Sequence, residues 1–368
     1  MIARGVKLDQ PRKLMVRATN WVGDAILSLP ALEALRGLYP EADIAVVAKP
    51  WVAELYLNHP AALRLMVYDP QGEHRGRRGF AQLIDSLRVE QFDAAILLQR
   101  AFHAAWMAWR ARVPVRVGYA TEARGALLTE AVRLPSPGYL SHQSSEYLEL
   151  LFRAGLLSHR PEPVRKVRLE VTRAERRWAV EALKTLGLDG PRYFVGLNPG
   201  ASFGPAKRWP ADRYAALGDR LAVALGADVL VFGSRAERPV AEAVARAMQH
   251  TPVVLAGATT LRQWMALTER CRLVLANDSG AMHVAAALGV PVVAIFGSTD
   301  ERATGPLSPW ARVVKHRVEC SPCGLRECPI DFRCMTGVTV DQVHRAALEL
   351  VAAHESAGRC GAGFQPAP

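Results

Sequence analysis

The sequence has no apolar run long enough to cross a membrane. Its longest stretch without an acidic or basic side chain, residues 279–299, is divided by Gly289, Pro291 and Gly297 into a helix-sized and a strand-sized piece. A spanning helix needs about 20 consecutive apolar residues. The N-terminal residues MIARGVKLDQPRK carry charge but no apolar segment, so no signal peptide is expected. These absences predict a cytoplasmic protein.

Two binding signatures are also missing. No run of Lys and Arg with interleaved aromatic residues occurs, so no nucleic-acid partner is expected. No GxGxxG follows an expected strand, which argues against a dinucleotide dehydrogenase. The formal net charge of +11 is spread along the chain and leans towards its N-terminal half. Such a balance fits an anionic substrate, a membrane surface rich in acidic lipid, or simply a solvated surface.

Cysteine is scarce outside one segment. Of six cysteines, Cys271 lies in an apolar run and Cys360 near the C-terminus, and the others fall within fifteen residues, at Cys320, Cys323, Cys328 and Cys334. In a cytosolic chain this pattern indicates either a metal site or a reduced structural loop. The spacing is irregular beside paired CxxC knuckles. No metal ligand is therefore assigned, and a zinc-organised interaction module stays open as an alternative.

Apolar β-rich runs alternate with helical patterns along most of the 368 residues. This alternation is typical of βαβ units and parallel sheets, and the length suits two domains. The sequence therefore predicts an α/β protein with two Rossmann-like, doubly wound domains that face each other across a cleft. Strands are expected at 13–18, 43–48, 64–69, 93–98, 115–120, 193–198, 227–233, 252–257, 272–277 and 291–297.

The predicted boundaries follow composition. Two helices, 142–157 and 173–187, flank a short strand at 167–171, and the Gly- and Pro-containing stretch 187–191 is a plausible hinge. The domains are predicted as a flexible N-terminus at 1–12, an N-terminal domain at 13–187, a C-terminal domain at 188–339, a last helix at 340–355 and a disordered tail at 356–368.

The loop after strand 272–277 is a candidate anion site, because ligands of doubly wound sheets bind beyond the carboxyl ends of strands. Gly280 leaves room for a phosphate at the start of helix 280–288, where free amides and the helix dipole favour negative charge. Asp278 either accepts from a ribose hydroxyl or caps the helix, and His283 can donate to an anionic group. Alternatively, Asp278 or Ser279 is simply an N-cap residue.

Two further loops follow the carboxyl ends of predicted strands in the same way. The loop 198–217 combines Ser202 and Lys207 with a glycine-rich backbone, so anion binding is expected there. In the loop 17–35, Asp24 stands at the start of a helix. It is either an ordinary cap or a carboxylate that takes a proton from an attacking hydroxyl.

Three motifs in this order resemble glycosyltransferase family 9, the ADP-heptose:lipopolysaccharide heptosyltransferases. They are VGDAILSLPALEALR (22–36), NPGASFGPAKRWP (198–210) and NDSGAMHVAAALGVPVVAIFG (277–297), and CSPCGLRECPIDFRCM (320–335) is similar to the heptosyltransferase II branch. The resemblance implies a GT-B fold, in which the N-terminal domain at 13–187 binds the acceptor and the C-terminal domain at 188–339 binds the nucleotide sugar. It also implies that Asp24 is the catalytic base and that Lys207 lies at the donor diphosphate. It also implies donor binding by Ser202, Asp278, Ser279, Gly280 and His283, and Glu237 is the nearest candidate for the acidic residue on the ribose.

The resemblance further implies inverting transfer of a heptose from ADP-heptose to a lipid-linked acceptor in the inner core of lipopolysaccharide. The enzyme would act in the cytoplasm, in peripheral contact with the inner membrane. No DxD sequence lies beside a nucleotide loop, so no cofactor and no metal are expected. A nucleotide-sugar epimerase of similar fold remains an alternative, and it would differ by needing no acceptor.

Overall fold

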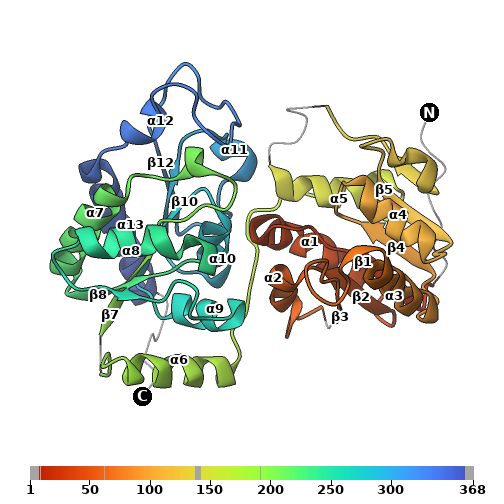
Figure 1. Ribbon diagram of the computed structural model, residues 1–368, viewed down its shortest axis with the longest axis horizontal. Coiled ribbons are helices and arrows are strands. Elements are labelled where there is room, and N and C mark those ends of the chain that lie inside the picture. The colour runs from red at the N-terminus through yellow and green to blue at the C-terminus, as the bar shows by residue number, and fades with distance from the viewer. Residues whose placement is uncertain (1–7, 9, 62, 137–141, 191, 361–368) are drawn as a thin grey trace. The chain divides into compact units, whose positions relative to one another are not determined.

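The computed structural model describes residues 8, 10–61, 63–136, 142–190 and 192–360. The chain divides into two compact units, Met1–Val164 and Arg165–Pro368, here called unit 1 and unit 2. Each unit has its own six-stranded parallel sheet with helices packed against it (Figure 1). The predicted α/β class with two doubly wound units is confirmed. No helix among the described residues is long and apolar enough to span a bilayer.

Unit 1 alternates strands and helices from its first described strand. Its elements are β1 (Lys13–Arg17), α1 (Val22–Leu38), β2 (Asp43–Ala48), α2 (Pro50–Ala53), β3 (Arg64–Val67), α3 (Gly76–Val89), β4 (Ala94–Leu97), α4 (Phe102–Arg110), β5 (Val115–Tyr119), β6 (Glu130–Val132) and α5 (Gln143–Arg153). Met15 and Val47 pack with Leu83 of α3 on one face of the sheet. Leu14 and Val46 point to the other face and are also fully buried. Burial of both faces is why these strands are continuous apolar runs.

Unit 2 repeats the pattern. Its elements are α6 (Arg173–Thr185), β7 (Tyr193–Asn198), α7 (Ala211–Leu225), β8 (Ala227–Val231), α8 (Arg238–Ala247), β9 (Val253–Val254), α9 (Leu261–Glu269), β10 (Leu273–Asn277), α10 (Gly280–Leu288), β11 (Val292–Phe296), α11 (Glu301–Thr304), β12 (Ala311–Lys315), α12 (Arg333–Thr336) and α13 (Val340–Cys360). Val195, Leu275 and Ile295 face a core shared with Leu221 of α7 and Val343 of α13.

The strand orders of the two sheets are the same. They are β3-β2-β1-β4-β5-β6 in unit 1 and, read from the opposite edge, β9-β8-β7-β10-β11-β12 in unit 2. The direction of winding therefore reverses between β1 and β4, and between β7 and β10. Doubly wound sheets bind ligands beyond the carboxyl ends of the strands at this reversal. The loops after β1, β7 and β10 are accordingly the places to look for a site.

The predicted domain boundary at 187 is wrong, because the division falls between Val164 and Arg165. Helix α6 belongs to unit 2, where Glu175 pairs with Arg262 of α9 at 2.6 Å. Arg176 pairs with Glu269 at the end of the same helix, at 2.7 Å. The stretch 187–191, predicted as a hinge, follows α6 inside unit 2, and residue 191 lies outside the described residues.

Smaller predictions also need correction. The apolar alternation at 167–171 forms no strand. Leu169 donates a backbone hydrogen bond to the Ala287 carbonyl, and the Glu170 carbonyl accepts from Arg262 Nη2 at 2.8 Å. Strands β6 and β12 were not predicted. Helix α13 runs on through residues 356–360 of the predicted disordered tail, and 361–368 lie outside the described residues. Most of the predicted flexible N-terminus, 1–7 and 9, also lies outside them.

Candidate functional site

Asn277, the last residue of β10, joins the two loops at the winding reversal of unit 2. Its side chain is fully buried. Its Nδ2 donates to the carbonyls of Pro199 at 2.8 Å and Gly200 at 3.2 Å. Its Oδ1 accepts from the backbone N–H of Trp209 at 3.0 Å. One amide side chain therefore fixes both ends of the loop after β7, and sequence reasoning did not identify this residue.

Lys207 and Asp278 form an ion pair across that reversal. Lys207 lies in the single turn of 3₁₀ helix Pro205–Lys207, and Asp278 follows β10 directly. Their Nζ and Oδ2 atoms are 2.5 Å apart, and the two side chains are 13% and 5% exposed. The ammonium also lies 4.8 Å from the centre of the Phe203 ring. The structure thus brings together two residues that the sequence placed in separate candidate loops.

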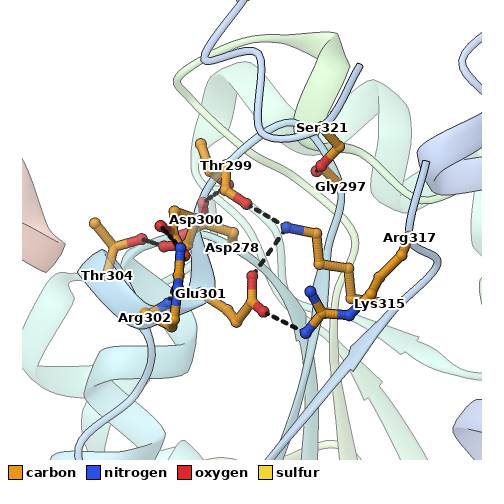
Figure 2. Close-up of polar contacts among 10 residues, drawn as sticks. All are labelled: Asp278, Gly297, Thr299, Asp300, Glu301, Arg302, Thr304, Lys315, Arg317 and Ser321. Atoms are coloured by element: carbon orange, nitrogen blue, oxygen red, sulfur yellow. Dashed lines mark hydrogen bonds and ion pairs between the residues drawn. The ribbon is translucent and has the colours of Figure 1, made fainter. Parts of the chain in front are cut away.

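Thr299, in the loop after β11, completes this arrangement. Its hydroxyl donates to Asp278 Oδ2. Its own carbonyl accepts from Lys315 Nζ at 2.9 Å, and Lys315 also pairs with Glu301 at 2.9 Å (Figure 2). Lys315 is 9% exposed at its side chain, so the loop is tied to β12 by a largely buried ammonium. Sequence analysis missed Thr299; its one signal was a position just after an apolar strand.

The start of α10 has the features of an anion site. Ser279 is the N-cap residue, and its side chain makes no capping hydrogen bond. Asp278 does not cap the helix either, since its carboxylate is engaged by Lys207 and Thr299. Ser279 thus holds the N-cap position that the alternative gave it, but its side chain leaves the first amides of α10 without a capping hydrogen bond. Gly280 is the first residue of α10, and His283 is buried one turn further on.

Glu237 and Ser202 meet beside Gly200. The Ser202 hydroxyl donates to Glu237 Oε1 at 3.4 Å. A Cβ on Gly200 would come within 2.4 Å of the Glu237 carboxyl carbon, so glycine makes room for this side chain. Glu237 Oε2 accepts from the backbone N–H and the hydroxyl of Ser234, both at 2.8 Å. The predicted ribose residue thus lies at the same strand edge as Lys207, although it also serves as a local cap.

The cysteine segment packs against the loop that carries Lys207. Arg326 accepts a backbone hydrogen bond from Ala206 at 3.0 Å and donates from Nε to the Phe203 carbonyl at 2.7 Å. Burial, and the negative charge of the three neighbouring sulfurs, raise the pKa of the Cys334 thiol. The four thiols, together with Ser298, line a cavity of about 70 Å³. Across the part of the chain that the structure covers, no three His, Cys, Asp or Glu side chains are arranged to hold a metal ion.

In unit 1, Asp24 stands in the first turn of α1 after β1. Its Oδ1 accepts from Gln143 Nε2, in the first turn of α5, at 3.1 Å. Burial raises the pKa of Tyr147 and of Tyr56, and the negative charge of Asp24 raises both further. Both phenols therefore stay protonated beside Asp24.

Three comparisons identify what the chain is similar to. The model of glycosyltransferase family 9 (heptosyltransferase) matches residues 80–332. Lipopolysaccharide heptosyltransferase 2 of Escherichia coli is 33% identical over 313 residues, 82% of this chain and 88% of that protein. The solved E. coli ADP-heptose LPS heptosyltransferase II superposes with a TM-score of 0.79 at 29% identity, over 93% and 99% of the two chains. A solved family 9 glycosyltransferase from Veillonella parvula superposes with a TM-score of 0.82 at 26% identity, over 95% of this chain and 99% of that one.

Proposed function

Since this chain belongs to glycosyltransferase family 9, the heptosyltransferases, we propose that it transfers a heptose from ADP-heptose to the inner core of lipopolysaccharide. It is a glycosyltransferase with the GT-B fold. The E. coli protein of similar structure is an ADP-heptose LPS heptosyltransferase. The nucleotide-sugar epimerase and the zinc-organised module are not favoured, because neither is a heptosyltransferase.

Lys207 at the winding reversal, 2.5 Å from Asp278, is the main support for the donor assignment. A diphosphate that approaches this edge meets an ammonium and the uncapped first turn of α10. Both favour negative charge, the first as a point charge and the second through its free amides and dipole. Ser202 and Ser279 add hydroxyl donors, and His283 adds an imidazole close to the same helix start.

The ribose would be held by Glu237. Its carboxylate lies against Gly200, where the missing side chain makes room for it at the strand edge. A carboxylate that accepts from ribose hydroxyls is the usual recognition of this sugar at doubly wound sheets. The contact of Ser202 with Glu237 at 3.4 Å is weak enough to be exchanged for a hydroxyl of the ligand.

Asp24 is the proposed base. The acceptor hydroxyl would lose its proton to Asp24 as its oxygen bonds to the anomeric carbon from the face opposite ADP. The bond from that carbon to the phosphate oxygen breaks, and ADP leaves with the electron pair. The configuration is therefore inverted. Donors aimed at the departing diphosphate stabilise its growing charge, typically by a few kcal/mol each.

We also propose that the reaction needs no metal, because Lys207 and the α10 amides supply the positive charge that a divalent cation supplies elsewhere. The acceptor is lipid-linked, so the enzyme would work in the cytoplasm, peripherally at the inner face of the inner membrane. The net charge of +11 supports this contact, because that surface carries acidic lipid.

A donor panel tests the proposal. ADP-, UDP- and GDP-linked heptose are incubated with a lipopolysaccharide acceptor truncated in the inner core, and heptose transfer is followed by mass spectrometry. We expect transfer from the ADP sugar alone, with and without a chelator. Equal use of a UDP or GDP sugar would refute the donor assignment. Conversion of the sugar without any acceptor would instead indicate an epimerase.

A further inference from the structure

Two cations at the carboxyl ends of the unit 1 strands have no acidic partner among the residues that the structure describes. Arg17 ends β1 and is 2% exposed. Its Nη1 donates to the carbonyls of Ala18 at 2.6 Å and Val47 at 3.1 Å. Lys49 follows β2 directly, and its ammonium lies 5.0 Å from the centre of the Trp51 ring. Among the described residues, no carboxylate pairs with either cation.

Electrostatic strain accompanies this arrangement. Burial lowers the pKa of Arg17 to about 10. Burial and the positive charge of Arg17 lower the pKa of Lys49. Burial and the positive charges of Arg17 and Lys49 lower the pKa of His103. The Nε of Arg17 is buried without a hydrogen-bond partner in the part of the chain described. A bound anion would relieve the repulsion between these groups.

An exposed aromatic surface adjoins the cations. Trp51 is 42% exposed, and its Nε1 donates to the Asn20 carbonyl at 2.7 Å. Asn20 in turn accepts from Arg17 Nη2 at 3.0 Å, so one residue joins the indole to the buried guanidinium. Trp21, the next residue, is 50% exposed. Large aromatic side chains left in solvent beside polar groups are typical of ligand surfaces.

We propose that Lys49 and Trp51 form a subsite for an acceptor sugar that carries a negative charge. The buried guanidinium of Arg17 would add positive electrostatic potential to this subsite. The apolar face of the sugar would pack on the indole, and its acidic group would bind the Lys49 ammonium. The acidic group is a carboxylate or a phosphate. This inference rests on the proposed function, because the sugar belongs to the acceptor. Asp24 lies in the first turn of α1, which follows Asn20 and Trp21, so the subsite would orient the acceptor near the base.

Binding without turnover tests the subsite. The delipidated inner-core acceptor oligosaccharide is titrated calorimetrically into the wild type, Lys49→Met and Trp51→Leu. We expect Kd to rise about tenfold for Lys49→Met, the lower end of what a hydrogen bond to a charged group contributes. Trp51→Leu should raise it about threefold or more. Lys49→Arg should bind nearly as the wild type does.

Lys13→Met is the matched control. Lys13 lies at the opposite end of β1 and contacts Glu90 at 3.4 Å, so its removal should not change Kd. An unchanged Kd for Lys49→Met, or no binding to the wild type, would overturn the subsite. If the wild type binds and Lys49→Met binds weakly, but ADP-heptose gives no transfer, only the proposed function fails.

Chemical treatment of the oligosaccharide separates the two acidic groups. Removal of phosphate by phosphatase should abolish the difference between wild type and Lys49→Met if phosphate is the group bound. Reduction of the carboxylates to alcohols should abolish it if a carboxylate is bound. A difference that survives both treatments together would overturn the proposal, because no charge would then be left for Lys49 to bind.

Discussion

The ammonium of Lys207 lies 2.5 Å from the Asp278 carboxylate, and both side chains are nearly buried. The two residues follow adjacent strands, β7 and β10, and are far apart in the sequence. A nearly buried pair of this kind is not simply a surface ion pair, because separating it leaves charge with little water to solvate it. It holds Lys207 at the strand edge where a diphosphate would bind.

Replacing Lys207 with Met should weaken ADP binding by about 10- to 100-fold, the range of a hydrogen bond to a charged group. Titration calorimetry with ADP measures this change. Lys184→Met is the control, because Lys184 is an exposed lysine of α6 outside the candidate site. Unchanged ADP affinity in Lys207→Met would show that the diphosphate does not contact this ammonium.

Replacing Asp24 with Asn should lower the rate of transfer by about 10²- to 10⁴-fold, the usual contribution of a general base. The affinity for ADP should stay close to that of the wild type, since the residues proposed to bind the donor lie in unit 2. Steady-state transfer and ADP titration are measured together. Asp85→Asn is the control, because Asp85 is exposed and pairs with Arg88 at the surface. Comparable loss of ADP binding in Asp24→Asn would contradict the role as base.

Replacing Thr299 with Val should raise the Kd for ADP by up to about tenfold. Without the hydroxyl, the Asp278 carboxylate loses the donor that fixes its orientation, and Lys207 is held less firmly. Thr299→Ser should restore the affinity. Thr304→Val is the control, since the Thr304 hydroxyl donates to the Asp300 carbonyl, at 3.4 Å, and not to Asp278.

A double-mutant cycle locates the effect of Thr299. If Thr299 acts through Asp278 and Lys207, its substitution should change little in the Lys207→Met background. Additive losses in ADP affinity would mean that Thr299 acts on the ligand by a separate route.

Replacing Glu175 with Gln should destabilise unit 2 by about 3 kcal/mol, because it leaves Arg262 buried without its anion. Hydrogen bonds from Arg262 hold the pKa of Glu175 at about 2, below its usual value, and burial opposes this. The contribution is therefore present above about pH 4.5 and is lost as the pH falls towards 2. The midpoint of urea unfolding measures it. Glu269→Gln removes the more exposed pair with Arg176 and should cost less than about 1 kcal/mol.

His59 should make the protein acid-sensitive. Its Nδ1 accepts from Ala61 N–H at 3.2 Å, and burial lowers its pKa to about 4. Glu33 lies 3.9 Å away but is 51% exposed, so its attraction is screened. Because the folded pKa is depressed, stability is full above about pH 6.5 and falls towards pH 4, by up to about 3 kcal/mol.

Urea unfolding between about pH 7.5 and about pH 4.5 tests this loss. His59→Asn can keep the acceptor for Ala61 but cannot be protonated, so its stability should fall less steeply. His159→Asn should follow the wild type, since His159 is exposed. Parallel curves for wild type and His59→Asn would show that His59 is not the group responsible.

Much of the fold followed from local pattern. Buried parallel strands are apolar on both faces, so runs such as LVLAN of β10 stood out from the helices between them. Strands β6 and β12 could not be recognised in this way, since β6 has only three residues and β12 is partly exposed. The alternation of apolar and polar residues at 167–171 led to a wrong prediction of a strand, because the single backbone hydrogen bond at Leu169 does not make a β-ladder.

The sequence by itself determined the class of fold, the loops at the strand edges and the residue types in them, because strand periodicity and helix starts depend on neighbours along the chain. It could not show that Asn277 would join two loops, that Thr299 would reach Asp278, or that α6 would belong to unit 2 through Arg262. Those contacts join residues far apart in the sequence, so only the packing of the strands and helices decided them.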